Sequence, residues 1–314
     1  MTLMKREKVT SRANCSSANI GSGFDVAGIC FNNFYDEMTL SVEDDQDIPV
    51  KIVHDDREID VSRNTAGSVI EEIRRLYKIT DKIKVSLTRG IPIGRGLGSS
   101  AASAAAAAIA MNEIFGIGLS KAELAFLSGN AEKVSSGSPH WDNACASIYG
   151  NCTFNISTDP FKVSSFKVSE NLFFGIIMPE IIIYRKTFTA RSMLPDNIPL
   201  KTAIAMSRNI TALMESLRNG DMKLLGQVMK RAVVDNYRIR MFPYLDELRK
   251  AFESDMNIGW CLSGAGPSIL IASNDHEELL SGMEQASDIF RDLSIPLSKR
   301  EMQIGDGAGI VNVG

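Results

Sequence analysis

The chain has 314 residues, of which 44% are hydrophobic and 23% are charged, and its formal net charge is -4. A chain of this length can bury cores for two domains, so it needs neither disulfides nor a structural metal. The acidic balance lacks the basic patch typical of nucleic-acid binding, and no apolar run reaches the roughly 20 residues of a membrane span.

The first half of the chain mixes strand-like and helix-like segments. Alternating apolar residues predict strands, and apolar residues at helical spacing predict helices. In chain order we expect strands at 9–17, 37–42, 50–53 and 85–87, and helices at 64–77, 99–115 and from 119 to 127. The polar run from Asp44 to Asp47 predicts a turn, and Ser120 with Glu123 has the pattern of a helix-capping box.

A loose polar stretch at 155–165 predicts a boundary between an N-terminal domain at 5–158 and a C-terminal domain at 165–314. Beyond it we expect strands at 173–178, 181–184, 260–262 and 269–272, and helices at 201–218, 224–234, 244–252 and 279–290. The two kinds of element do not alternate regularly, which indicates an α+β fold and not a parallel sheet.

A loop rich in glycine and serine lies between a predicted strand and the helix at 99–115. Its residues are Pro92, Ile93, Gly94, Arg95, Gly96, Leu97, Gly98, Ser99, Ser100, Ala101 and Ala102. Glycines allow close backbone approach, and a helix N-terminus offers free N–H groups and the positive end of its dipole, so the loop suits a phosphate. It lacks the Gly-Lys-Ser/Thr of a Walker A loop and the third glycine of the dinucleotide fingerprint. From these residues alone, a glycine-rich turn that binds nothing is the alternative.

Residues 92–101 resemble the second motif of the GHMP kinase superfamily, Pro-x3-Gly-Leu-Gly-Ser-Ser-Ala. Residues 16–25 are similar to the first superfamily motif in the form found in homoserine kinases, and 136–143 resembles a segment typical of homoserine kinases. Residues 263–268 resemble the third superfamily motif. The resemblance spans almost the whole chain. It implies an N-terminal domain like ribosomal protein S5 domain 2, a ferredoxin-like C-terminal domain, and an acceptor site between them.

The resemblance to homoserine kinases implies an ATP-dependent phosphotransferase that uses Mg²⁺. Its expected reaction is phosphorylation of the hydroxyl of L-homoserine to O-phospho-L-homoserine, in threonine biosynthesis. A homodimer is expected, without nucleic-acid or membrane partners. Two alternatives are a GHMP-type kinase with another small acceptor such as mevalonate, and a nucleotide-binding regulator without catalysis.

The resemblance also implies which residues bind the acceptor, a zwitterion. Asn19 and Asp25 match the pair that binds the ammonium group, although from its surroundings Asp25 equally suits a turn. Arg191 and Arg238 match the pair that binds the carboxylate, since a guanidinium offers parallel donors, and surface arginines are the alternative. The other acceptor residues implied in this way are His140, Asp142, Asn143 and Thr187.

Catalytic roles are implied for Ser100, Glu132 and Asn143. Ser100 and Glu132 match the magnesium ligands, and magnesium commonly takes few protein carboxylates beside substrate phosphates. Asn143 lies near the acceptor hydroxyl and cannot take a proton, so no protein base is needed, although Asp142 stays open as one. Asn64 matches an adenine contact and is equally suited to cap the helix that follows it.

The five cysteines are scattered and form no C-x-x-C pair, and the N-terminal residues lack the apolar core of a signal peptide. We therefore expect reduced, buried cysteines, no zinc site and a cytoplasmic location.

Overall fold

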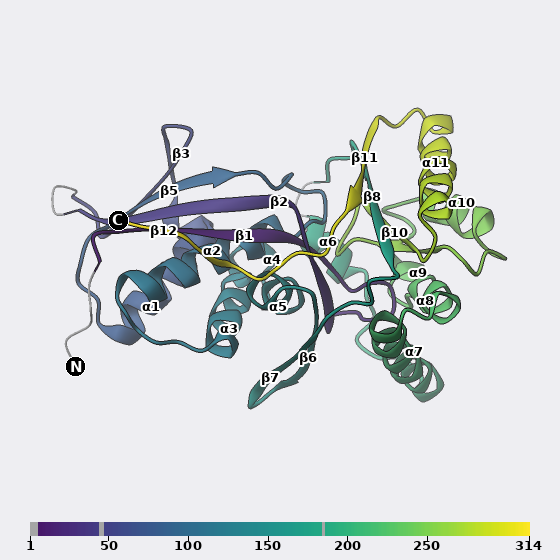
Figure 1. The fold of residues 1–314 in the computed structure, drawn as a ribbon, viewed down its shortest axis with the longest axis horizontal. Helices are drawn as coiled ribbons and strands as arrows, with labels where there is room; N and C mark the ends of the chain where they lie inside the picture. Colours follow the sequence, from purple (N-terminus) through teal and green to yellow (C-terminus); the bar gives the residue numbers. More distant parts are fainter. Residues whose placement is uncertain (1–5, 44–46, 184–185) are drawn as a thin grey trace.

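The computed structural model describes residues 6–43, 47–183 and 186–314. Its larger sheet has eight strands, with helices packed against one face (Figure 1). The main path runs β12-β1-β2-β5-β3-β4, and a β6–β7 hairpin extends from β2. The bounds are β1 (Lys8–Ala18), β2 (Ala27–Val42), β3 (Val50–His54), β4 (Arg57–Ile59), β5 (Ile83–Arg89), β6 (Cys152–Thr158), β7 (Phe161–Phe166) and β12 (Gly309–Val313).

Helix α2 lies at the centre of the layer that covers this sheet. The alanines at 104–108 on it are fully buried, because their small side chains let the helix approach β1, β2 and α1 closely. The capping box predicted for α3 is confirmed, since Ser120 and Glu123 satisfy each other's backbone N–H groups. The layer consists of η1 (Val61–Arg63), α1 (Thr65–Tyr77), α2 (Ser99–Ile114), α3 (Lys121–Ala131), α4 (Lys133–Ser136) and α5 (Asp142–Tyr149).

The second half of the chain forms a four-stranded antiparallel sheet in the order β11-β8-β10-β9. Its strands are β8 (Phe173–Pro179), β9 (Gly259–Leu262), β10 (Ile269–Ser273) and β11 (Leu297–Met302). Its helices are α6 (Lys186–Ser192), α7 (Leu200–Asn219), α8 (Met222–Met229), α9 (Asp235–Arg238), α10 (Tyr244–Ala251) and α11 (His276–Asp292). The mixed content confirms the α+β class.

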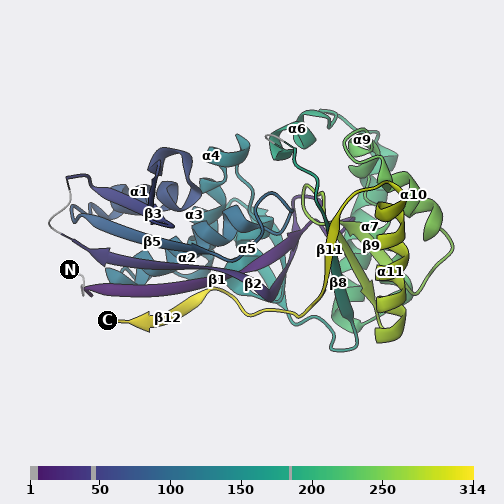
Figure 2. The same cartoon turned by 90° about the horizontal axis from the view of Figure 1, so that it is seen from above.

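The two halves are joined by a shared core and by the end of the chain. Leu213 and Met229 belong to the same buried cluster as Ile29 of the first sheet. Strand β12 pairs antiparallel with β1, so the C-terminus returns to the larger sheet (Figure 2). The division at 5–158 and 165–314 stays a prediction.

Three predictions about local structure were wrong. The stretch expected to be loose forms the β6–β7 hairpin, because its apolar residues pack: Phe154 stacks on Phe166, and Phe161 packs against Phe126 and Trp141. The helix predicted at 224–234 ends at Met229. Near this end, the hydroxyl of Ser22 in the β1–β2 turn donates to the carbonyl of Val228.

The strand predicted at 181–184 is absent at 181–183, and Tyr184 lies outside the described residues, as do Asp44, Asp45 and Gln46 of the predicted turn. All five cysteines are free and buried. Over the described ranges, no helix combines the length and apolar character needed to cross a membrane.

The glycine-rich loop at 92–102, called the phosphate loop from here on, is fixed at both ends by one buried carboxylate, that of Asp36 on β2. One of its oxygens accepts hydrogen bonds from the backbone N–H groups of Gly90 (3.1 Å) and Ile91 (3.2 Å), just before the loop. The other accepts from the hydroxyl of Ser103 (2.7 Å) on α2, just after the loop. Asp36 is fully buried, and this burial raises its pKa although the three donors favour the charged form.

We expect Asp36→Ala to lower the free energy of unfolding by about 2 kcal/mol, because it leaves buried donors without an acceptor. If the loop binds ATP, as the resemblance implies, the KM for ATP is expected to rise as well, since the loop loses its anchor at both ends. Urea denaturation and initial rates would measure the two effects. The control is Asp288→Ala, which removes an exposed carboxylate paired with Arg291. An unchanged KM for ATP would contradict the positioning role.

Candidate active site

A cavity of about 460 Å³ lies where the two halves meet, with the phosphate loop on one side. Segments far apart in the chain line it: the β1–β2 turn, the phosphate loop, the α4–α5 turn, α6, α9 and the β9–β10 loop. The predicted site residues that line it are Asn19, Asp25, Asn64, Pro92, Ile93, Gly94, Gly96, Leu97, Gly98, Ser99, Ser100, Ala101, Glu132, His140, Asp142, Asn143, Thr187, Arg191 and Arg238.

Two predicted members of the phosphate loop do not line this cavity. Arg95 turns toward the second half of the chain and donates to the carbonyl of Pro179 at the end of β8. Ala102 is fully buried in the first turn of α2, where its methyl group packs in the core. A role of these two loop residues in binding ATP stays a prediction.

The phosphate loop needs glycine where other backbone approaches it. Gly96 has φ of 81°, and a Cβ there would lie 2.2 Å from the carbonyl oxygen of Ser263. Gly98 has φ of 67°, and a Cβ there would lie 2.2 Å from the hydroxyl oxygen of Ser16. Gly98 also begins α2 without any side-chain cap, so the first N–H groups of this helix are available to an anion in the cavity.

The β9–β10 loop, which holds the third motif, packs directly on the phosphate loop. The hydroxyl of Ser263 donates to the carbonyl of Gly96 (2.7 Å) and lies 2.9 Å from the hydroxyl of Ser17. The N–H of Gly264 donates to the carbonyl of Ala18 (3.1 Å). The first and third motifs thus meet at the second.

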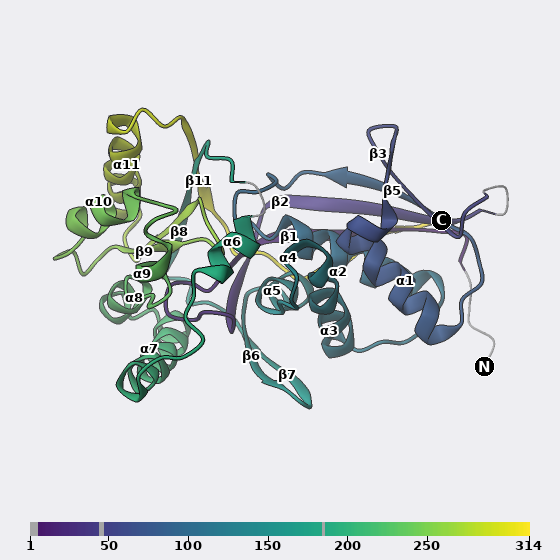
Figure 3. The same ribbon diagram turned by 180° about the vertical axis from the view of Figure 1, so that it is seen from behind.

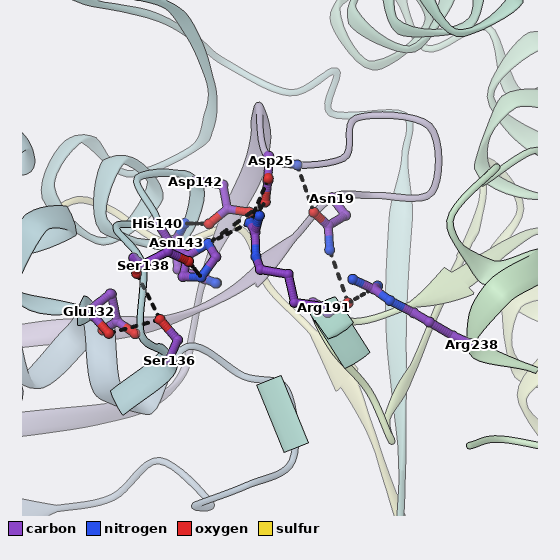
Figure 4. A network of polar contacts seen from close by, with 11 residues as sticks. Asn19, Asp25, Glu132, Ser136, Ser138, His140, Asp142, Asn143, Arg191 and Arg238 are labelled. Atoms are coloured by element: carbon purple, nitrogen blue, oxygen red, sulfur yellow. Dashed lines mark hydrogen bonds and ion pairs between the residues drawn. The ribbon is translucent and has the colours of Figure 1, made fainter. Parts of the chain in front are cut away.

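A carboxylate and a guanidinium that line the cavity, those of Asp25 and Arg191, form an ion pair (Figure 4). Arg191 Nη2 lies 2.6 Å from both carboxylate oxygens of Asp25 and 2.9 Å from Nδ1 of His140. Burial opposes ionisation of Asp25, but His140 and Arg191 outweigh it, so the pKa of Asp25 lies below its usual range. Asp25 is therefore an anion at neutral pH.

Arg238 adds a second guanidinium, and this one is almost fully buried. Arg238 Nη1 and Asn19 Nδ2 both donate to the carbonyl of Gly264, at 3.3 Å and 3.0 Å. Figure 4 shows the Arg238 and Asn19 side chains pointing toward each other. Asn19 Oδ1 also accepts from the N–H of Asp25 (3.0 Å). The Nε of Arg238 is buried without a partner, and its guanidinium lies 5.3 Å from the ring centre of Phe24. Arg238 is thus no surface arginine.

Glu132 is buried and has one oxygen without a partner. Its Oε2 accepts from the hydroxyl of Ser135 (3.1 Å), which lies 3.4 Å from that of Ser100, whereas Oε1 has no hydrogen bond. Burial raises the pKa of Glu132. A buried carboxylate oxygen that lacks a hydrogen-bond donor suits a hard cation. No group of three or more His, Cys, Asp or Glu side chains able to hold a metal occurs among the described residues.

Asp142 and Asn143 begin α5 beside this cluster. The hydroxyl of Ser16 donates to Asn143 Oδ1 (2.9 Å), which fixes the orientation of the amide. Asp142 accepts from the N–H of Asn143 (2.7 Å). Burial and the nearby Asp25 carboxylate raise the pKa of Asp142 to about 6.

Asn64 caps α1, as one of its two predicted roles requires. Its Oδ1 accepts from the N–H groups of Ala66 (2.9 Å) and Gly67 (3.4 Å). It also lines the cavity, so a nucleotide contact stays compatible with the cap.

Sequence reasoning missed several lining residues. Gly264 lies within a segment that resembles a motif, but the sequence assigned no role to it. Phe24 and Lys186 each lie beside a residue that was predicted, Asp25 and Thr187. No local pattern distinguishes Lys186, since only folding brings it to the phosphate loop.

Comparison with known proteins identifies both halves of the chain. The model described as the GHMP kinases N terminal domain matches residues 64–151, and the one described as GHMP kinases C terminal matches residues 213–290. A homoserine kinase of Thermoplasma volcanium is 33% identical over 293 residues, which cover 93% of each chain.

Solved structures agree on the fold. The crystal structure of homoserine kinase from Cytophaga hutchinsonii matches with a TM-score of 0.85 and 29% identity, over 98% of each chain. Mevalonate diphosphate decarboxylase from Staphylococcus aureus matches with a TM-score of 0.73 over 98% of each chain, at 14% identity. That second likeness concerns the fold alone.

Proposed function

The chain belongs to the homoserine kinases of the GHMP kinase family, and from this premise we propose that it transfers the γ-phosphoryl group of ATP to the hydroxyl of L-homoserine. The products are ADP and O-phospho-L-homoserine. One observation carries the choice of acceptor: Asp25, Arg191 and Arg238 line the same cavity as the phosphate loop.

This set of charges complements a zwitterionic amino acid. Asp25 with Asn19 suits an ammonium group, and the two arginines suit a carboxylate. Asp25 and Arg191 pair with each other at 2.6 Å. When a zwitterion binds, its ammonium group can replace Arg191 as the partner of Asp25, and its carboxylate can replace Asp25 as the partner of Arg191. An acceptor with a carboxylate alone, such as mevalonate, draws Arg191 away and leaves Asp25 without a cation, which disfavours it.

The opposite end of the cavity suits the phosphates of ATP. The uncapped N-terminus of α2 and the backbone of the phosphate loop offer N–H groups to the phosphate oxygens. Glu132 Oε1 and the hydroxyl of Ser100 are the groups that would hold Mg²⁺. When bound, this ion neutralises charge on the phosphate oxygens.

In the transfer step, the acceptor hydroxyl oxygen bonds to the γ-phosphorus while the bond from that phosphorus to the bridging oxygen of ADP breaks. The amide oxygen of Asn143 accepts from Ser16, which orients the side chain, and its amide NH2 group positions the acceptor hydroxyl. Asn143 cannot take the proton, which in this mechanism passes to the transferred phosphoryl group or to solvent. His140 and Thr187 complete the acceptor side. Positioning and charge neutralisation supply most of the rate enhancement.

We further propose that the reaction serves threonine biosynthesis, that the protein acts in the cytoplasm, and that it forms a homodimer. The five free, buried cysteines fit a reducing compartment. The pathway and the dimer rest on the resemblance to homoserine kinases.

ADP release with a panel of acceptors tests the proposal. We expect release with L-homoserine, and much less with L-threonine, L-serine, mevalonate or shikimate, in the presence of Mg-ATP. EDTA is expected to abolish it, with activity restored by added Mg²⁺. The homoserine assignment fails if another acceptor is turned over and homoserine stays at background.

The variant Asp25→Ala tests whether Asp25 contributes to binding homoserine and not to binding ATP. We expect the KM for homoserine to rise about 10- to 100-fold, because a charge-assisted contact with the ammonium group is lost. The KM for ATP is expected to change less than twofold. Asp246→Ala, which breaks an exposed pair with Arg249, is the matched control. Equal effects on both substrates would mean that Asp25 only shapes the β1–β2 turn.

Asp142→Asn tests whether a protein base is needed. We expect kcat to stay within about tenfold of the wild-type value, because a loose transition state depends little on proton removal. If Asp142 were the base, kcat would fall as the pH drops through about 6, since protonation removes the base. The variant would then lose about 10²- to 10⁴-fold and this pH dependence with it.

A further inference from the structure

Lys186, the first residue of α6, bridges two loops at the edge of the cavity. Its Nζ donates to the carbonyl of Gly94 in the phosphate loop (2.9 Å) and to the carbonyl of Gly266 in the β9–β10 loop. Figures 2 and 3 show α6 at the junction of the two halves, with α4 and α5 on one side and the C-terminal helices on the other. The lysine therefore reaches the phosphate loop from the second half of the chain.

The charged groups that face Lys186 are cations. They are Arg95 of the phosphate loop and Arg238 of α9, and with burial they lower the pKa of Lys186 to about 7. Within the described ranges, no carboxylate forms an ion pair with it. The Lys186 side chain is partly buried, and an ammonium withdrawn from water is ordinarily paired with an anion. Here the structure offers two carbonyl dipoles and an adjacent site shaped for phosphate.

Lys230 shows how a lysine held by carbonyls looks elsewhere in this chain. Its Nζ donates to the carbonyls of Phe252 and Asp255, much as Lys186 does to two others. It differs in having the charge of the Asp255 carboxylate nearby, which favours its ammonium form. It does not line the cavity. Contacts with carbonyl groups therefore do not by themselves explain why, among the described residues, no carboxylate pairs with Lys186.

We propose that Lys186 binds the phosphate chain of ATP, exchanging a carbonyl partner for a phosphate oxygen when the nucleotide enters. The inference rests on the proposed function and deepens it, since it adds a phosphate contact that comes from the C-terminal half. An ammonium acts on phosphate as a compact point charge, and a lysine near the transferring group offsets charge that spreads over its oxygens. The residue is then catalytic as well as a link between the loops.

The competing hypothesis is that Lys186 acts only as a strut, a structural link that holds the two loops together without contacting the nucleotide. A strut shapes the whole cavity, so its loss affects every ligand of the nucleotide site. A phosphate contact affects only ligands that carry phosphates. The two roles therefore differ in their effect on adenosine.

Calorimetric titration without acceptor distinguishes the roles, with adenosine, ADP and the β,γ-methylene analogue of ATP as ligands. We expect Lys186→Met to weaken ADP and the analogue about 10- to 100-fold and adenosine less than twofold. Lys186→Arg should keep most of the affinity, because the positive charge remains. Lys230→Met is the matched control and should match the wild type.

The pH dependence gives a second readout that a strut does not predict. Below about 7 the ammonium of Lys186 is charged and attracts phosphate, and above that pH the free protein loses this charge. Wild-type affinity for ADP should therefore fall more steeply than that of Lys186→Met or Lys186→Arg as the pH rises from about 6.5 to 8.5.

The inference is overturned if Lys186→Met binds phosphate-bearing ligands as the wild type does, or loses adenosine and ADP equally. If that variant does not fold, as judged by circular dichroism, Lys186→Arg and the wild-type pH dependence decide. A wild-type protein that binds neither ADP nor the analogue refutes the proposed function itself, and this inference with it.

Discussion

The site depends on the close contact between the phosphate loop and the β9–β10 loop. At Gly96 the two backbones approach so closely that no side chain fits between them. Ser263 then binds the carbonyl of Gly96 and contacts Ser17, which joins the three motif segments at one point. Because the contact is made by backbone and small side chains, it holds the loop rigidly while leaving the helix N-terminus open toward the cavity.

Buried charge is the second constraint on this junction. Asp25, Arg191 and His140 contact one another. In the described part of the chain, Arg238 Nε and Glu132 Oε1 are buried without a hydrogen-bond partner, and the ammonium of Lys186 forms no ion pair with a carboxylate. Uncompensated groups of this kind are costly in a protein interior and cluster where ligands bind. All three of these residues line the same cavity as the phosphate loop.

Local patterns predicted most of the fold because they act over short distances. The alanine-rich run of α2, the capping box of α3 and the apolar alternation of β5 each carry their own signal. The β6–β7 hairpin was missed because its aromatic residues gain their partners from α3 and the α4–α5 turn. The predicted end of α8 was wrong for a similar reason, because the hydroxyl of Ser22 in the β1–β2 turn donates to the carbonyl of Val228.

The sequence alone determined the glycine-rich loop before α2 and, through its resemblance to known kinases, predicted the residues around the acceptor, since both depend on short contiguous segments. It could not show that Asp25 pairs with Arg191, that one oxygen of Glu132 lacks a partner, or that Lys186 reaches Gly94. These features join residues as much as 166 positions apart. Only tertiary packing decides them, because burial and distance set the cost of each charge and no local pattern records either.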